Sequence, residues 1–171
     1  MIYLFGRLGA DLVYLSLGSN VGDRTANLQA AIKQLQASET VKAVSGFYEA
    51  EPVELYDQPW FLNCVVALHT TKSPAELLKK ILAIELEMGR VRLRDKGPRS
   101  IDIDIILFGD QVVEERGLQI PHPAMHERRF VLAPLTEMAP DAVHPKTGKT
   151  AHELLAALPP GQVVRRLDPG I

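Results

Sequence analysis

Cysteine and long apolar runs are scarce in this sequence, and each shortage excludes a class of protein. The single cysteine, Cys64, can neither close a disulfide within the chain nor build a metal cluster alone. No run approaches the roughly 18 apolar residues that span a bilayer. Residues 1–12 lack the early basic region of a signal peptide. We therefore expect a cytoplasmic protein with no membrane partner.

The net charge is also small, and aromatic side chains are few. The chain has 19 basic and 21 acidic residues, a net charge of -2, and only 6% of its residues are aromatic. A nucleic-acid-binding sheet needs a basic face and exposed aromatic side chains. We therefore expect no nucleic-acid partner, although a local basic cluster remains compatible with these totals.

What the sequence does have is enough apolar material for a core. With 171 residues, 46% of them hydrophobic, we expect one domain over residues 1–171, with residues 1–12 as an N-terminal extension. No internal repeat or linker divides the chain. The sequence does not indicate an oligomeric state, and we expect a monomer.

The apolar pattern predicts an alternation of strands and helices. Strands are expected over residues 13–17, 41–48, 60–68 and 101–108. Capping signals predict helices that begin after Asp23 and after Ser73, the second ending at Gly89. Beyond these we expect a hairpin over 111–120, a helix over 125–138 bent or interrupted at Pro134, and a helix over 150–158. This order is typical of an α+β, ferredoxin-like α/β sandwich, with helices on one face of an antiparallel sheet and the active site on the other side.

Two carboxylates lie two residues apart on the fourth predicted strand. Asp102 and Asp104 therefore point the same way, while Ile101, Ile103 and Ile105 point into the core. Carboxylate oxygens in such a pair suit Mg²⁺, which shares its coordination shell with substrate phosphates. In isolation the pair is better explained as a solvated strand edge.

Arginines next to this pair change that balance. Arg90, Arg92 and Arg94 alternate through a loop, and Arg99 precedes Asp102 by three residues. Guanidinium groups bind phosphate oxygens bidentately. A metal-bound polyphosphate needs carboxylates to hold the metal and cations to hold the phosphate oxygens. The combination of acids and arginines therefore favours phosphoryl transfer over a solvated basic loop.

Weaker candidates lie elsewhere in the chain. His122 and Arg128 can donate to phosphate oxygens, although a histidine beside prolines is more often structural. Phe61 and Asn63 share one strand face, an arrangement that can stack on a flat heterocycle and hydrogen-bond to it, or can be an ordinary surface. Glu85 lies off the apolar stripe of its helix and is either solvated or turned towards the arginines. No Walker-type phosphate loop, catalytic triad or zinc spacing is present.

Several short motifs occur in order over roughly residues 13–140. The motifs are Leu17-Gly18-Ser19-Asn20, Asp57-Gln58-Pro59-Trp60-Phe61-Leu62-Asn63, Glu85 with Gly89-Arg90-Val91-Arg92, Gly97-Pro98-Arg99-Ser100-Ile101-Asp102-Ile103-Asp104, and Ile120-Pro121-His122-Pro123 with Arg128. Together, and in this order, they resemble the 6-hydroxymethyl-7,8-dihydropterin pyrophosphokinase family of folate biosynthesis. The run from Gly97 to Asp104 is the most specific.

The resemblance implies transfer of pyrophosphate from ATP to the hydroxymethyl group of the pterin, with release of AMP. Asp102 and Asp104 would bind two Mg²⁺ ions, and Arg90 and Arg92 would act on the phosphates from a catalytic loop. ATP, the co-substrate, would be held by Glu85, Arg99, His122 and Arg128. The pterin would be held by Phe61, Asn63, Phe130 and the backbone of the loop over residues 50–53, from Ala50 to Val53.

Four positions depart from the family's usual pattern. Lys96 stands where many members have an aromatic residue, and Ala50 and Ser100 stand where threonine is usual. Pro123 follows His122 where some members have an aromatic residue. Two alternatives remain: a non-catalytic ferredoxin-like module that binds ligands or nucleic acid, and another pterin-pathway enzyme such as an aldolase, which would not need the acid pair and the arginine loop together.

Overall fold

One antiparallel sheet organises the molecule. The computed structural model describes residues 11–52, 56–89 and 98–168. Its elements are β1 (Asp11–Ser19), α1 (Arg24–Ser38), β2 (Thr40–Val44), β3 (Tyr48–Ala50), β4 (Phe61–Thr70), α2 (Pro74–Glu87), β5 (Asp102–Phe108), β6 (Val113–Glu115), β7 (Leu118–Ile120), the 3₁₀ helix η1 (Met125–Glu127), α3 (Arg129–Met138), α4 (Ala151–Ala156) and β8 (Val164–Arg166).

The strand order of the main sheet is β5-β1-β4-β3-β8, and β2 also pairs with β4. Every pairing in it is antiparallel. The central strands β1 and β4 are non-consecutive neighbours, which is the split βαβ connection expected of a ferredoxin-like fold. The predicted fold class is therefore confirmed.

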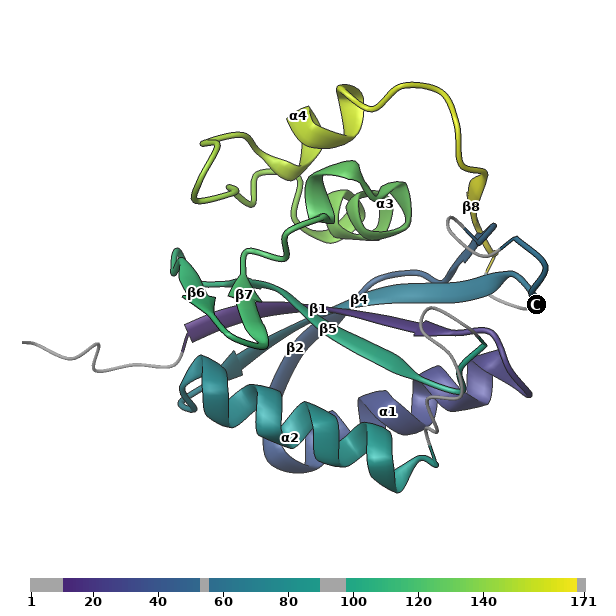
Figure 1. Cartoon of the computed structure of the whole chain (residues 1–171), viewed down its shortest axis with the longest axis horizontal. Helices are drawn as coiled ribbons and strands as arrows, with labels where there is room; N and C mark the ends of the chain where they lie inside the picture. Colours follow the sequence, from purple (N-terminus) through teal and green to yellow (C-terminus); the bar gives the residue numbers. More distant parts are fainter. Residues whose placement is uncertain (1–10, 53–55, 90–97, 169–171) are drawn as a thin grey trace, which may run out of the picture.

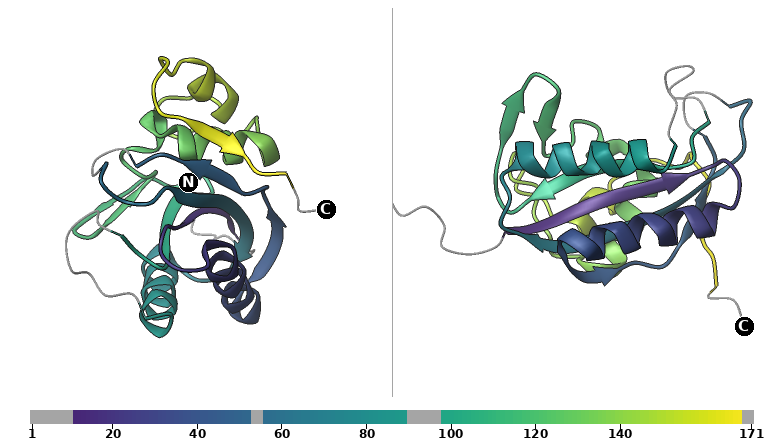
Figure 2. Two further views of the ribbon diagram at one scale, coloured as in Figure 1. Left: turned by 90° about the vertical axis from the view of Figure 1, so that its right-hand side faces the viewer. Right: turned by 90° about the horizontal axis from the view of Figure 1, so that it is seen from below.

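Helices α1 and α2 lie side by side under one face of the sheet (Figures 1 and 2). Asp23 and Ser73 cap their N-termini by accepting bonds from the backbone N–H groups of Ala26 and Glu76, as predicted. The apolar stripes of both helices are buried against alternate residues of β1, β4 and β5. The main core forms here, because each strand turns every second side chain towards the helices.

The opposite face of the sheet is partly covered, which the sequence did not predict. Figure 1 shows α3 and α4 above the sheet, on the side away from α1 and α2. A second core joins Val65 of β4 and Leu107 of β5 to Val131, Leu132 and Leu135 of α3. Only the remainder of this face, near the C-terminal end of β1, is left for a site.

Two predicted elements were wrong in detail. The single strand expected over 41–48 is split into β2 and β3, because Ser45 leaves the strand pattern and its hydroxyl accepts a bond from the Val65 N–H. The helix expected over 125–138 is interrupted at Arg128, whose backbone is extended, and α3 runs on through Pro134. Burial of Val131 and Leu135 offsets the one backbone bond that Pro134 removes.

Other boundaries shift by a few residues or were missed. Strand β1 begins at Asp11, inside the predicted N-terminal extension, and the hairpin of β6 and β7 lies within the predicted 111–120. Strand β8 was not predicted, since three residues carry too little alternation to be recognised. In the described ranges, no helix has the length and apolar character to cross a membrane.

The packing of α2 can be tested with two neighbouring residues of that helix. We expect Ile81→Ala, at a fully buried position, to lower the free energy of unfolding by about 2–5 kcal/mol because it leaves a cavity. Leu82 is 49% exposed, so Leu82→Ala should change stability by less than about 0.5 kcal/mol. Urea unfolding followed by circular dichroism measures both, and equal losses would contradict this packing.

Candidate active site

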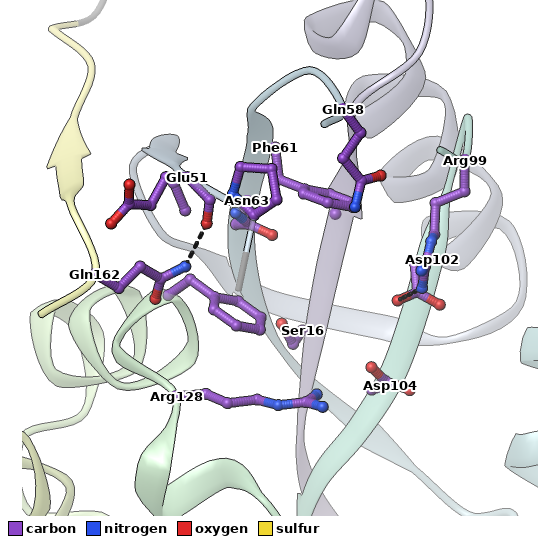
Figure 3. Close-up of a pocket in the computed structure, with 14 residues that line it drawn as sticks. Ser16, Glu51, Gln58, Phe61, Asn63, Arg99, Asp102, Asp104, Arg128 and Gln162 are labelled. Carbon is purple, nitrogen blue, oxygen red and sulfur yellow. Dashed lines mark hydrogen bonds and ion pairs between the residues drawn. The ribbon is translucent and has the colours of Figure 1, made fainter. Parts of the chain in front are cut away.

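The carboxylates of Asp102 and Asp104 face the uncovered part of the sheet. In the register of β5 and β1, Asp102 lies opposite Gly18 and Asp104 opposite Ser16. Their neighbours Ile103 and Ile105 are buried in the core beneath. Figure 3 shows both carboxylates pointing into a pocket on this face, so the predicted orientation of the pair is right.

The pocket brings together residues from six segments of the chain. Those that line it are Ser16, Gly18, Ala50, Glu51, Pro52, Gln58, Phe61, Asn63, Arg99, Asp102, Asp104, Arg128, Phe130 and Gln162. Seven of the predicted site residues are among them: Asp102, Asp104, Arg99, Arg128, Phe61, Asn63 and Phe130. Residues far apart in sequence therefore converge where the sequence analysis placed the site.

Arg99 is held at the edge of the pocket by Asn20. The Asn20 side-chain oxygen accepts a bond from the Arg99 N–H at 2.8 Å, and the Asn20 N–H donates to the Arg99 carbonyl at 3.1 Å. Asn20 also donates to the Gln58 side chain and the Pro59 carbonyl. The Arg99 guanidinium lies 3.0 Å from the Asp102 carboxylate and over the Phe61 ring, 5.7 Å from its centroid. A positive and a negative group are thus fixed side by side at the pocket wall.

Asn63 supplies an unsatisfied donor at the base of the pocket. It is 3% exposed, and its side-chain nitrogen has no hydrogen-bond partner among the described residues. A buried, unpaired amide is costly, so a ligand group is the natural acceptor. Gly18 makes room for the Asn63 side chain itself: a Cβ there would lie 2.8 Å from the Asn63 side-chain oxygen and 3.6 Å from the Phe61 ring.

Arg128 and Phe130 come from the junction between η1 and α3. The extended backbone of Arg128 interrupts the helix and starts α3, so the two side chains enter the pocket from above the sheet. The Arg128 guanidinium lies 5.6 Å from the centre of the Phe130 ring. A second cation and a second aromatic ring therefore face the carboxylates across the pocket.

His122 lines an adjoining hollow rather than the pocket itself. This hollow is bounded by Asp104, Gln119 and Pro123, so Asp104 is common to both cavities. Burial of the imidazole and the positive charge of Arg128 lower the His122 pKa to about 4, while Asp102 acts weakly in the other direction. His122 is therefore a neutral donor or acceptor at physiological pH.

Glu85 lies on α2 and contacts strand β5. It is buried on α2, and its carboxylate accepts a bond from the Ile103 N–H at 3.3 Å. Ile103 lies between Asp102 and Asp104 on an edge strand, so Glu85 supports the strand that carries the acid pair. It does not line the described pocket, and its contact with ATP stays a prediction.

Three of the expected site residues, Arg90, Arg92 and Val53, lie outside the described residues, as does Lys96. Other lining residues were not singled out from the sequence. Gly18 and Gln58 belong to motifs quoted for the resemblance, but neither was assigned a role. Glu51 belongs to the loop over residues 50–53 whose backbone the resemblance placed at the pterin. Ser16 and Gln162 carried no signal, because only the strand register and the returning C-terminal segment bring them to the pocket.

The fold and pocket define an α+β protein with an acid pair, two arginines and two phenylalanines around one pocket, features that suit a nucleotide-dependent transferase. Residues 14–140 match the model of the 7,8-dihydro-6-hydroxymethylpterin-pyrophosphokinase (HPPK) family. The chain belongs to this family.

Similar proteins agree with that assignment. The chain is 46% identical over 155 residues to the 2-amino-4-hydroxy-6-hydroxymethyldihydropteridine pyrophosphokinase of Methylorubrum extorquens, covering 89% of this chain and 96% of the relative. It is also 46% identical over 150 residues to the folic acid synthesis protein fol1 of Schizosaccharomyces pombe, covering 86% of this chain but 20% of that protein. The chain thus spans about a fifth of the length of such fol1 relatives.

Solved structures with a similar fold include the wild-type Plasmodium falciparum HPPK-DHPS. The TM-score is 0.70 at 18% sequence identity, and the match covers 86% of this chain and 44% of that one. At this identity the likeness supports the fold alone. The ferredoxin-like architecture is therefore found in a protein whose name includes the same family.

The electrostatic environment of His122 gives a direct test of the site geometry. We expect its ring signals to titrate with a midpoint near pH 4 in two-dimensional NMR, well below the usual 6.5. Arg128→Met should raise this pKa by removing a positive charge, and Asp102→Asn should lower it by removing a negative one. A wild-type midpoint near 6.5, or shifts of the same sign in both variants, would contradict the arrangement.

Proposed function

We propose that this protein transfers the terminal pyrophosphate of ATP to the hydroxymethyl group of 6-hydroxymethyl-7,8-dihydropterin, releasing AMP, in cytoplasmic folate biosynthesis. One observation carries the proposal. The register of the sheet places Asp102, Gly18 and Asn63 in a single row across β5, β1 and β4. An acid pair and an unsatisfied amide thus share one pocket, about 10 Å apart across the strands.

The names of the similar proteins support the same activity. The relative from Methylorubrum extorquens, nearly all of whose length is covered, is named as a pyrophosphokinase of this pterin. The fol1 relatives are named for folic acid synthesis. We propose that residues 1–171 act as a single pyrophosphokinase domain and a monomer, without a nucleic-acid partner.

The donor set of the pocket fits Mg²⁺. Asp102 and Asp104 are two carboxylates on one face, and no group of three or more metal-binding side chains occurs in the described part of the chain. Mg²⁺ usually takes one or two carboxylates and completes its shell with waters and substrate phosphates, so two acids suffice. We propose that this pair would hold two Mg²⁺ ions, which would neutralise charge on the triphosphate when bound.

The remaining charged residues are proposed to hold the polyphosphate. Arg99 and Arg128 face the pocket as fixed guanidinium groups, and a neutral His122 can donate one hydrogen bond without adding charge. Arg90 and Arg92, which follow α2 in the sequence, are proposed to act on the transferring group. Glu85 is proposed to serve the nucleotide side through its support of β5.

The pterin is proposed to lie over Asn63, between aromatic side chains. Phe61 and Phe130 offer two ring faces at the pocket, and stacking on a flat heterocycle leaves its edge free for hydrogen bonds. The unsatisfied Asn63 nitrogen would donate to the heterocycle, and the backbone near Val53 would complete its edge. The absence of a side chain at Gly18 lets the Asn63 amide occupy this position.

The reaction requires positioning and charge neutralisation. The pterin hydroxyl oxygen attacks the β-phosphorus of ATP, the bond from that phosphorus to the oxygen bridging to the α-phosphate breaks, the hydroxyl proton is lost, and AMP leaves with the bridging oxygen. Cys64 cannot serve as a nucleophile, because burial raises the pKa of its thiol to about 12 and holds it in the core. The protein's task is therefore to align two substrates.

The nucleotide product distinguishes this reaction from ordinary phosphoryl transfer. With ATP, Mg²⁺ and 6-hydroxymethyl-7,8-dihydropterin, we expect AMP and the pterin diphosphate in equal amounts, measured by anion-exchange chromatography. Omitting the pterin should abolish AMP formation, which controls for simple hydrolysis. ADP as the pterin-dependent product would refute the proposal.

A further inference from the structure

The C-terminal segment returns to the pocket from beyond residues 14–140, the part that matches the family. Strand β8 pairs antiparallel with β3, with Val164 opposite Ala50 and Arg165 opposite Glu49. Gln162, two residues before β8, is one of the pocket-lining residues. The pocket wall that follows β3 is therefore built against the end of the chain.

Glu51 is the residue of this wall that the C-terminal segment holds. Its N–H donates to the Val163 carbonyl at 3.1 Å, and its carboxylate accepts from the Val163 N–H at 2.8 Å. Its carbonyl accepts from the side-chain amide of Gln162 at 2.6 Å (Figure 3). In the first two bonds the C-terminal segment contributes only the backbone of residue 163, which almost any residue there provides. Within the C-terminal segment, only the bond to the carbonyl depends on a particular side chain, that of Gln162.

The bond from Gln162 also fixes a second lining residue. The Glu51 carbonyl and the Pro52 ring nitrogen belong to one planar peptide unit, so orienting the carbonyl also orients the ring. Pro52 is buried and lines the pocket. One side-chain amide therefore sets the position of two successive residues in the wall.

The location of this wall indicates which substrate it serves. In Figure 3, Glu51 and Gln162 lie on one side of the pocket and Arg99, Asp102 and Asp104 on the other, with Asn63 between them. The charged side suits the polyphosphate. On the side of Gln162 the Glu51 carboxylate is bound to the Val163 N–H. The other polar groups there are a neutral amide and a backbone carbonyl, which suit the edge of an uncharged heterocycle.

We propose that Gln162 is a positioning residue for the pterin, acting through the Glu51 carbonyl and the Pro52 ring. The inference rests on the proposed pyrophosphokinase function and deepens it. Gln162 contributes to the affinity for the pterin and leaves the affinity for ATP and the chemical step nearly unchanged.

Steady-state kinetics of Gln162→Leu test the proposal, because leucine keeps a similar volume but cannot donate. We expect the KM for the pterin to rise roughly fivefold to tenfold, the equivalent of one lost hydrogen bond. The KM for ATP and kcat at saturating pterin should stay within about twofold. Gln162→Glu, which sets an anion against the carbonyl, should raise the pterin KM at least as much and provides a second variant if the leucine protein does not fold.

The matched control is Arg165→Gln, on the strand β8 that follows Gln162. Arg165 pairs with Glu49 at 2.9 Å and lies over the Trp60 ring, so the change loosens β8 without touching Glu51. Its pterin KM should stay within about twofold of the wild type. An unchanged pterin KM in both Gln162 variants, an equal rise in Arg165→Gln, or a parallel rise in the KM for ATP would overturn the inference. Failure of the proposed function itself would show separately, as a wild-type protein that forms no AMP with this pterin.

Discussion

The pairing of β1 with β5 on one side and β4 on the other is the constraint on which the site depends. It places Asp102 opposite Gly18 and Gly18 opposite Asn63, so that three strands contribute to one row. Residues opposite one another in an antiparallel pair face the same side of the sheet. A register shift of one residue in β5 would turn both carboxylates into the core and Ile103 and Ile105 into the pocket, which burial of the isoleucines opposes.

Around this row, the loops and added helices divide the pocket into two chemically different sides. Asn20 holds Arg99 against Asp102 by two backbone-directed bonds, which makes one side charged and rigid. The junction before α3 adds Arg128 and Phe130, and the segment before β8 adds Gln162 opposite the carboxylates. A charged substrate part and a flat neutral one can therefore bind next to each other, as transfer between them requires.

Much of this arrangement could be predicted from the sequence, because it depends on local patterns. The caps at Asp23 and Ser73, the alternation over residues 101–105 and the shared face of Phe61 and Asn63 were all visible as residue types at fixed spacing. What could not be predicted depends on long-range contacts. The second core under α3, the support of the Ile103 N–H by Glu85 and the bond from Gln162 to Glu51 join segments whose proximity only the folded sheet creates.

The central claim is that Asp102 and Asp104 hold divalent metal beside a pterin that rests over Asn63. Anomalous diffraction from crystals grown with Mn²⁺, a non-hydrolysable ATP analogue and the pterin tests it most directly. We expect two anomalous peaks within coordination distance of the two carboxylates and of phosphate oxygens, with the heterocycle against Asn63. Manganese bound elsewhere, or a pterin outside the Asn63 side of the pocket, would contradict the account.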